Sequence, residues 1–353
     1  ANRDLGCDWP VTVKLHRIGG IVISIVAVVV VATALGSVQI PLGDILGMLV
    51  SNIPGLKGLV NADWPLAREV IVLQVRLPRV LLALVVGGGL SVSGVLFQGS
   101  LRNPLADPYI IGVSSGASLG ATVGLLFFIP GGLVGFGALP VFAFAGAMVA
   151  TLIVSRLGKY RGRLEPTSLI LAGVAVGAVL TAVVSFLMVL RIQNLADVYL
   201  WLMGSLSGRG WQHLAVATPY VLAGVVLALW LAKDLNVYLL GEEAAHSLGI
   251  DVQHLQRWVL IIGSLMAAAC VSVSGVIGFV GLMVPHALRL LFGAEHRRLI
   301  LHSFWVGAIF LLVADTIART VLSPTELPVG IITALVGGPF FIYLMKRGSG
   351  YHG

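Results

Sequence analysis

The residue types that usually perform chemistry are sparse in this chain and do not cluster. Gly158-Lys159 is followed by Tyr160, and no glycine stands five residues before Gly158, so the phosphate-binding loop of an ATPase is absent. The eight histidines form no H-E-x-x-H zinc pattern, and no serine stands in a G-x-S-x-G turn between a strand and a helix. Cys7 and Cys270 are too isolated to indicate a disulfide framework. The sequence therefore predicts a protein that is not an enzyme and has no cofactor or metal.

Carboxylates inside the apolar stretches are also rare, and Asp315 is the clear case. A carrier driven by protons or sodium usually places carboxylates near the middle of the membrane. Asp315 instead lies toward one end of its stretch, with Arg319 four residues later, which predicts an ion pair within one helix. An ion-coupled secondary carrier is therefore the alternative, and a channel or membrane scaffold is a third reading.

The composition indicates that most of this chain lies in lipid rather than in water. Of 353 residues, 58% are hydrophobic and only 10% are charged, whereas a soluble domain carries about 25% charged residues. Apolar stretches long enough to cross a bilayer recur along the chain. They predict an all-α polytopic membrane protein of about ten helices, at 17–36, 77–98, 109–128, 133–155, 167–190, 213–232, 257–273, 276–292, 299–320 and 328–345. Residues 195–206 are apolar but short, which predicts an interfacial or re-entrant helix.

The basic residues predict how these helices are oriented. With an even number of spans and both termini in the cytoplasm, 15 of the 22 Lys and Arg residues fall on the cytoplasmic side. The group Arg156, Lys159, Arg161 and Arg163 is the strongest anchor. The net charge of +7 is then explained by topology, and no nucleic-acid partner is expected. The basic residues before Ile18–Leu35 and the Ala32-Thr33-Ala34 sequence resemble a signal peptide, but we interpret this stretch as the first span.

Regularly spaced glycines predict close helix packing. Gly112, Gly116, Gly120 and Gly124 fall on one face of one helix, and Gly173 and Gly177 repeat the spacing on another. The expected domains are a cytoplasmic segment at 1–16, a transmembrane domain at 17–346 and a cytoplasmic tail at 347–353. Within the domain, the loop at about 238–253 reads as a short amphipathic helix, either a plain surface helix or a lever for a cytoplasmic motor.

Several motifs, which follow one another in a fixed order, favour the interpretation of this loop as a lever for a cytoplasmic motor. Arg76-Leu77-Pro78-Arg79 enters the second span and Gln98-Gly99-Ser100-Leu101-Arg102-Asn103-Pro104 leaves it. The later motifs are Leu171-Ala172-Gly173, Gly241-Glu242-Glu243-Ala244-Ala245, Gly278-Phe279-Val280-Gly281, Val284-Pro285-His286, Glu326-Leu327-Pro328 and Gly337-Gly338-Pro339. This set, spread over residues 17–346, resembles the permease subunits of type II ABC importers for iron–siderophore complexes, haem and vitamin B12.

The resemblance implies a dimer with a second, identical or paralogous permease chain in the bacterial inner membrane. It also implies two cytoplasmic ATPase subunits and a periplasmic or lipoprotein substrate-binding protein. ATPase coupling is then expected at Gly241, Glu242, Glu243, Ala244, Ala245, Leu248 and Gly249. Docking of the binding protein is expected at Arg76, Arg79 and Arg319, and a cytoplasmic gate at Asn103, Leu105, Thr167 and Ser168.

Each assignment has a simpler alternative. Arg76 and Arg79 could anchor a helix end in the headgroups, and Arg319 could be occupied by Asp315. Helix capping would account for Asn103, Thr167 and Ser168, and plain packing for Leu105. His286 is read as a packed residue at a proline kink. Arg191 and Arg209 favour an anionic cargo or serve as interfacial anchors. The expected cargo is an iron–siderophore complex, with haem and cobalamin next.

Overall fold

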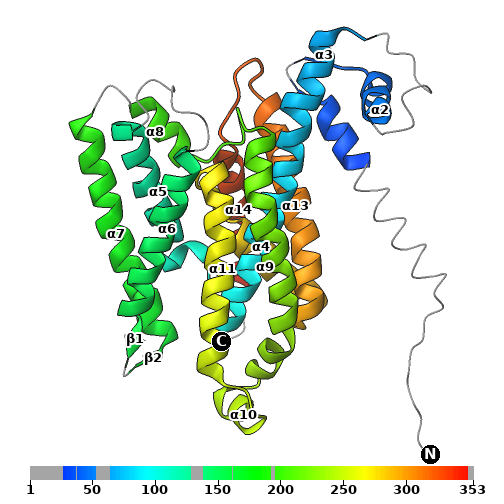
Figure 1. Cartoon of the computed structure of the whole chain (residues 1–353). Coiled ribbons are helices and arrows are strands. Elements are labelled where there is room, and N and C mark those ends of the chain that lie inside the picture. The colour runs from blue at the N-terminus through cyan, green and yellow to red at the C-terminus, as the bar shows by residue number, and fades with distance from the viewer. Residues whose placement is uncertain are drawn as a thin grey trace, which may run out of the picture.

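The computed structural model describes residues 27–36, 38–52, 64–128, 138–160, 162–191 and 195–348. Long helices run side by side between two ends of the molecule (Figure 1). One end carries the short helix α10 (Glu242–Ser247) and the β1–β2 hairpin, and is called the α10 end below. The opposite end carries α2 (Leu42–Ser51), α3 (Leu66–Val70) and α8 (Leu195–Leu202), and is called the α3 end.

The helices follow the apolar stretches of the sequence closely. They are α4 (Leu77–Ser100), α5 (Val113–Val123), α6 (Ala138–Leu157), α7 (Pro166–Leu190), α9 (Trp211–Tyr238), α11 (Val252–Ser274), α12 (Val280–Phe292), α13 (His296–Thr320) and α14 (Val329–Gly348). The short segments η2 (Ile71–Arg76) and η4 (Gly124–Phe128) are π-helices, which are wound more loosely than an α-helix. The segment η3 (Pro108–Ile111) is a 3-10 helix, which is wound more tightly. In the hairpin, β1 (Lys159–Tyr160) pairs antiparallel with β2 (Arg163–Leu164).

Among the described residues, six helices are long and apolar enough to cross a membrane, and shorter apolar helices accompany them. The predicted all-α polytopic fold is therefore confirmed. Of the predicted first span, 17–36, only the last part is described, with helix at 27–34. Residues 133–137 of the fourth predicted span also lie outside the described residues.

Several boundaries differ from the prediction. α9 ends at Tyr238 rather than at residue 232, and α11 begins at Val252 rather than at residue 257. The second span starts earlier, because α3, η2 and α4 form one continuous helix from Leu66. The predicted helix at 276–292 begins only at Val280, since Gly275 and Phe279 adopt left-handed backbone conformations with φ of 69° and 68°. The helix α2 was not expected from the sequence.

The helix α4 forms the centre of the bundle, packed by α9, α11, α12 and α13. Its residues from Val86 to Ser100 are all buried. Small residues allow this, because a Cβ added at Gly94 would lie 1.7 Å from the carbonyl oxygen of Gly281, and one at Gly87 would lie 2.3 Å from that of Gly307. Backbones in direct contact supply the van der Waals attraction that holds helices together in lipid.

The predicted glycine face on residues 112–124 packs against α6. A Cβ at Gly116 would lie 2.4 Å from the Gly146 carbonyl oxygen, and one at Gly120 would lie 2.1 Å from that of Phe142. Gly173 of α7 approaches the Ile110 carbonyl in the same way. The predicted glycine positions therefore lie where neighbouring helices pack. These contacts join α5, α6 and α7 into one group beside the central helices.

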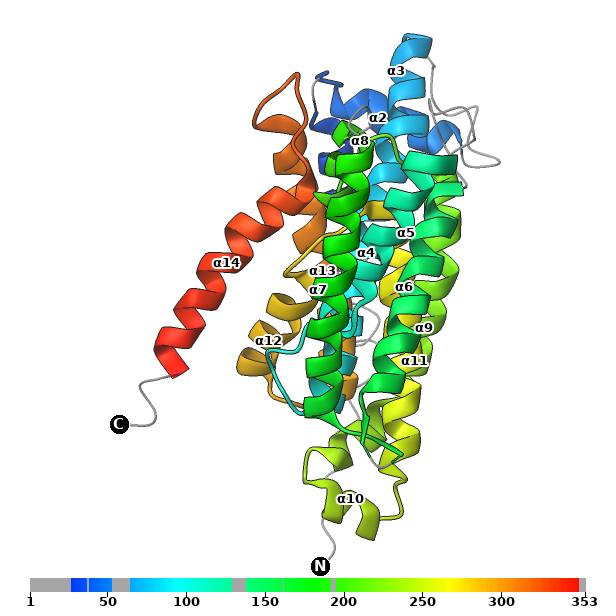
Figure 2. The same cartoon turned by 90° about the vertical axis from the view of Figure 1, so that its left-hand side faces the viewer.

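Two helices leave broad apolar faces uncovered by the rest of the chain. α7 exposes most of its large apolar side chains, including Leu171, Val179 and Phe186 at 62–64%. α14 leans away from the bundle on the side that faces left in Figure 2. These faces remain free for lipid or for another protein chain.

A test of the central packing replaces Gly94 by alanine. We expect a fall in the melting temperature of the detergent-solubilised protein, because the added methyl group has no room beside Gly281 and overpacking costs about 1–3 kcal/mol. Gly43→Ala is the matched control, since nothing lies within 4 Å of its added Cβ. Equal melting temperatures for the two variants would contradict the close approach of α4 and α12.

Candidate functional site

The predicted coupling segment, residues 238–253, stands out from the α10 end of the bundle (Figure 1). Gly241 precedes the single-turn helix α10 with φ of 119°, and Gly249 follows it with φ of 84°. Both glycines therefore make turns that an L side chain would strain. They fold the chain back between α9 and α11, so that α10 is held at two points.

The apolar residues of the coupling segment divide between two directions. Ala245 is fully buried against the bundle, whereas Leu240 and Leu248 are 71% and 64% exposed. Glu242 and Glu243 are also exposed and lie in the first turn of α10. An exposed surface that combines two leucines and two carboxylates on a firmly anchored helix is suited to contact with a soluble protein.

A polar cleft of about 730 Å³ separates α10 from the hairpin. Its lining includes Arg163 of β2, Glu242 and Glu243 of α10, and Asp251 and Gln253 at the start of α11. Acidic and basic side chains thus face the same space. The basic group that the sequence identified as a topology anchor therefore also contributes Arg163 to the surface around the coupling segment.

The predicted gate residues lie at the same end, after α4 and at the start of α7. Asn103 Oδ1 accepts a hydrogen bond of 2.9 Å from the Leu105 amide, and Leu105 is 39% exposed. Ser168 donates through its amide and its hydroxyl to Glu165 Oε2, while Thr167 is exposed. Asn103 thus holds a turn, and Glu165 caps α7.

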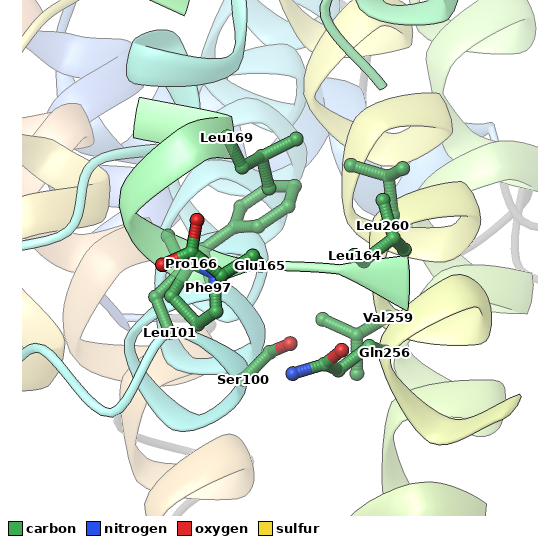
Figure 3. Close-up of a pocket in the computed structure, with 10 residues that line it drawn as sticks. All are labelled: Phe97, Ser100, Leu101, Leu164, Glu165, Pro166, Leu169, Gln256, Val259 and Leu260. Carbon is green, nitrogen blue, oxygen red and sulfur yellow. The ribbon is translucent and has the colours of Figure 1, made fainter. Parts of the chain in front are cut away.

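The residues beside the two gate segments meet around a small pocket (Figure 3). It is lined by Ser100 and Leu101 at the end of α4, by Leu164, Glu165 and Pro166 before and within the first turn of α7, and by Gln256 of α11. The structure therefore brings the end of α4 and the start of α7 next to α11, although none of the four predicted gate residues lines this pocket. The gating role itself stays a prediction.

Glu165 was missed by the sequence analysis, although its signal is present. An acidic residue followed by proline and an apolar stretch is a typical helix start, with the carboxylate as cap and Pro166 in the first turn. The hydrogen bonds from Ser168 lower the pKa of the Glu165 carboxyl group. The cap is therefore charged at neutral pH.

The three predicted docking arginines lie at the α3 end and point into the protein. Arg79 donates to Asp315 at 2.9–3.1 Å and to Glu326 at 2.7 Å. Arg319 makes the predicted ion pair with Asp315, at 3.1 Å. Arg76 donates to the carbonyl oxygens of Thr33, Ala34 and Val38. We call Arg76, Arg79, Arg319, Asp315 and Glu326 the arginine cluster.

The arginine cluster has a structural role that the sequence did not reveal. All three arginines are only 4–5% exposed. Arg76 and Arg319 donate to carbonyls at the end of the helix at 27–34, where cationic donors are favourable. Arg79 joins α4, α13 and the loop before α14. The guanidinium groups thus serve this chain's own packing, and their docking role stays a prediction.

The cluster is unbalanced in charge, with three arginines against two carboxylates. Glu326 is its most accessible member, with one third of its side chain exposed. Burial acts to raise the pKa of Glu326, but the hydrogen bond and charge of Arg79 outweigh it and the pKa is lowered. Buried pairs of this kind cost about 3–5 kcal/mol when one partner is removed, so the cluster fixes the geometry of the α3 end.

The remaining predicted residues do not belong to the arginine cluster, and His286 contacts the backbone of Pro104 between the predicted gate residues Asn103 and Leu105. Arg191 ends α7 and stacks over the Phe127 ring at 5.3 Å. Arg209 is half-buried in the loop before α9, with Nη1 3.4 Å from His213 Nε2. His286 is half-buried inside α12, one residue after Pro285. Within the described residues, no group of three His, Cys, Asp or Glu side chains could hold a metal ion.

Known proteins resemble this chain along nearly its whole length. The cobalamin import system permease protein BtuC of Halobacterium salinarum is 42% identical over 332 residues, with 90% of this chain and 88% of the relative covered. The iron(III) dicitrate transport system permease protein FecD of Escherichia coli is 42% identical over 287 residues, covering 81% and 88%.

A solved structure agrees with the sequence relatives. It is described as an inward-facing conformation of an ABC transporter assigned to the metal-chelate type. Its chain is 31% identical, superposes with a TM-score of 0.74, and is matched over 93% of this chain and 97% of its own length. The model of the FecCD transport family matches residues 23–347. That range contains both the central helix α4 and the exposed helix α10. The chain therefore belongs to the FecCD transport family.

Proposed function

We propose that this chain is the membrane permease subunit of an ATP-driven importer that moves a metal chelate into the cytoplasm. The exposed helix α10 carries the proposal, because a short helix anchored at both ends can transmit a push from a motor protein. The chain has no phosphate-binding loop of its own. ATP hydrolysis is therefore assigned to two separate ATPase subunits that contact the coupling segment.

The distribution of basic residues supports a cytoplasmic location for the α10 end. Basic residues are more numerous there than at the α3 end, as expected for the cytoplasmic side. Those in the described part of the chain are Arg102, Arg156, Lys159, Arg163, Lys233, Arg257, Arg289, Arg297, Arg298 and Lys346. The expected location is the bacterial inner membrane, with both termini in the cytoplasm.

The exposed faces of α7 and α14 support assembly with a second permease chain. Both helices are apolar and expose many of their large apolar side chains, and α14 is tilted away from the bundle (Figure 2). A wide path between two such chains would suit a large chelate, because weak apolar walls allow release. The relatives named above for iron dicitrate and cobalamin support a metal chelate as the cargo. Iron–siderophore is the first choice, before haem and cobalamin.

Transport in proteoliposomes tests the importer directly. With the permease, its ATPase and its binding protein present, we expect chelate uptake only when ATP is on the α10 side and the binding protein is on the α3 side. ATP is the energy source in this proposal, so collapse of ion gradients with an ionophore should leave uptake unchanged. Uptake driven by an ion gradient without ATP would instead establish a secondary carrier.

Charge reversal on α10 tests the coupling assignment. The double variant Glu242→Lys, Glu243→Lys should lower co-purification of the ATPase at least fivefold, because both carboxylates are exposed where the partner is proposed to bind. Melting of the membrane bundle should not change. Asp197→Lys, an exposed acidic residue of α8 at the α3 end, is the matched control. Normal ATPase recovery with the double variant would remove these carboxylates from the coupling surface.

Docking of the binding protein at the arginine cluster is proposed from its excess positive charge. Arg76 is the informative position, because its recorded partners among the described residues are backbone carbonyls. Arg76→Gln should weaken binding-protein affinity about tenfold in a surface plasmon resonance titration, whereas Arg76→Lys keeps the charge and should lose less. Melting curves of both variants control for the loss of hydrogen bonds within the chain. Equal affinities for the two variants would rule out a charge role for Arg76.

A further inference from the structure

A hydrogen bond connects the start of α11 with the hairpin. The Gln253 Oε1 atom accepts from the Leu164 amide at 3.0 Å, although the two residues are 89 positions apart. Gln253 is the last residue of the coupling segment and lies in the first turn of α11. Any displacement of the coupling segment that moves the first turn of α11 therefore acts on Leu164.

On the other side of this bond, Leu164 is joined directly to the cap of α7. The next residue is Glu165, whose carboxylate accepts from the Ser168 amide at 3.1 Å and from the Ser168 hydroxyl. The carboxylate thereby fixes the first turn of α7, where the predicted gate residues Thr167 and Ser168 lie. The connection from the first turn of α11 to the start of α7 thus contains one side-chain hydrogen bond, one peptide unit and one helix cap.

Most side chains that line the adjacent pocket are apolar and have little directionality (Figure 3). Leu164 lies on the same side as Val259 and Leu260 of α11, and Leu169 lies across from them beside Phe97 of α4. Apolar surfaces of this kind hold helices together but allow them to slide, because the attraction depends on area rather than on direction. The hydrogen bond of Gln253 is directional, so it fixes the register of the hairpin along α11.

We propose that Gln253 is a positioning residue that transmits movement of α10 to the first turn of α7. It pulls on Leu164, and the Glu165 cap carries that pull to Thr167 and Ser168. The inference rests on the proposed function, in which an ATPase pushes on the coupling segment. It adds a specific mechanical link between ATP hydrolysis and the opening of the α7 segment.

The test compares two substitutions of similar length at Gln253. Gln253→Met removes the hydrogen-bond acceptor, whereas Gln253→Glu retains an oxygen that can accept from the Leu164 amide. In proteoliposomes containing the full transporter, the ATP hydrolysed per chelate transported is measured for each. We expect this ratio to rise at least fivefold in Gln253→Met, with ATPase co-purification and hydrolysis within twofold of the unmodified chain. Gln253→Glu should keep the ratio within twofold.

Each other outcome has a distinct meaning. An unchanged ratio in Gln253→Met would overturn the link while leaving the importer intact. Equal losses in both variants would also overturn it, because the acceptor would then not be the relevant feature. If the unmodified chain recovered no ATPase, the proposed function would fail and the inference with it. A melting temperature for Gln253→Met within a few degrees of the unmodified chain excludes unfolding as the cause.

Discussion

Contact between backbones around α4 is the constraint on which the rest of the structure depends. In lipid, apolar side chains gain nothing by leaving the solvent, so helices must attract each other through close contact. The glycines of α4 bring the carbonyls of Gly281 and Gly307 within reach of its own backbone. The positions of α12 and α13 follow from these approaches, and with them the position of Asp315 opposite Arg79.

The two ends of the bundle use polar interactions in different ways. At the α3 end, Arg79, Arg319 and Asp315 are buried together, and the geometry is fixed by bonds that are costly to break. At the α10 end, carboxylates such as Glu165, Asp251 and Glu295 cap helix starts close to solvent. The molecule thus buries its ion pairs at the α3 end and places helix-capping carboxylates close to solvent at the end where α10 projects.

An exposed α10 end suits the permease proposed above, whose energy would come from a separate protein. The coupling segment is held between α9 and α11 by Gly241 and Gly249, yet its leucines and carboxylates face outward. The bond between Gln253 and Leu164 then extends its reach to α7.

Much of the fold could be predicted, because lipid imposes a length and a hydropathy on every span. The spans from 77 to 345, the short helix near 195 and the glycine faces of α5 and α7 were all recognisable in that way. The late start of α12 was not predictable, since Phe279 adopts its left-handed conformation only within this packing. Nor was the continuation of α4 back to Leu66, which apolar length alone does not indicate.

The sequence by itself determined the membrane class, the helix pattern, the lack of a phosphate-binding loop motif and the glycine-flanked motif at Gly241–Gly249, because these depend on local composition and spacing. Only the tertiary structure decided which charges meet. Arg79 and Asp315 are 236 residues apart, and Gln253 and Leu164 are 89 apart. A single sequence shows which side chains can pair, but the packing of helices decides which pairs come within hydrogen-bonding distance.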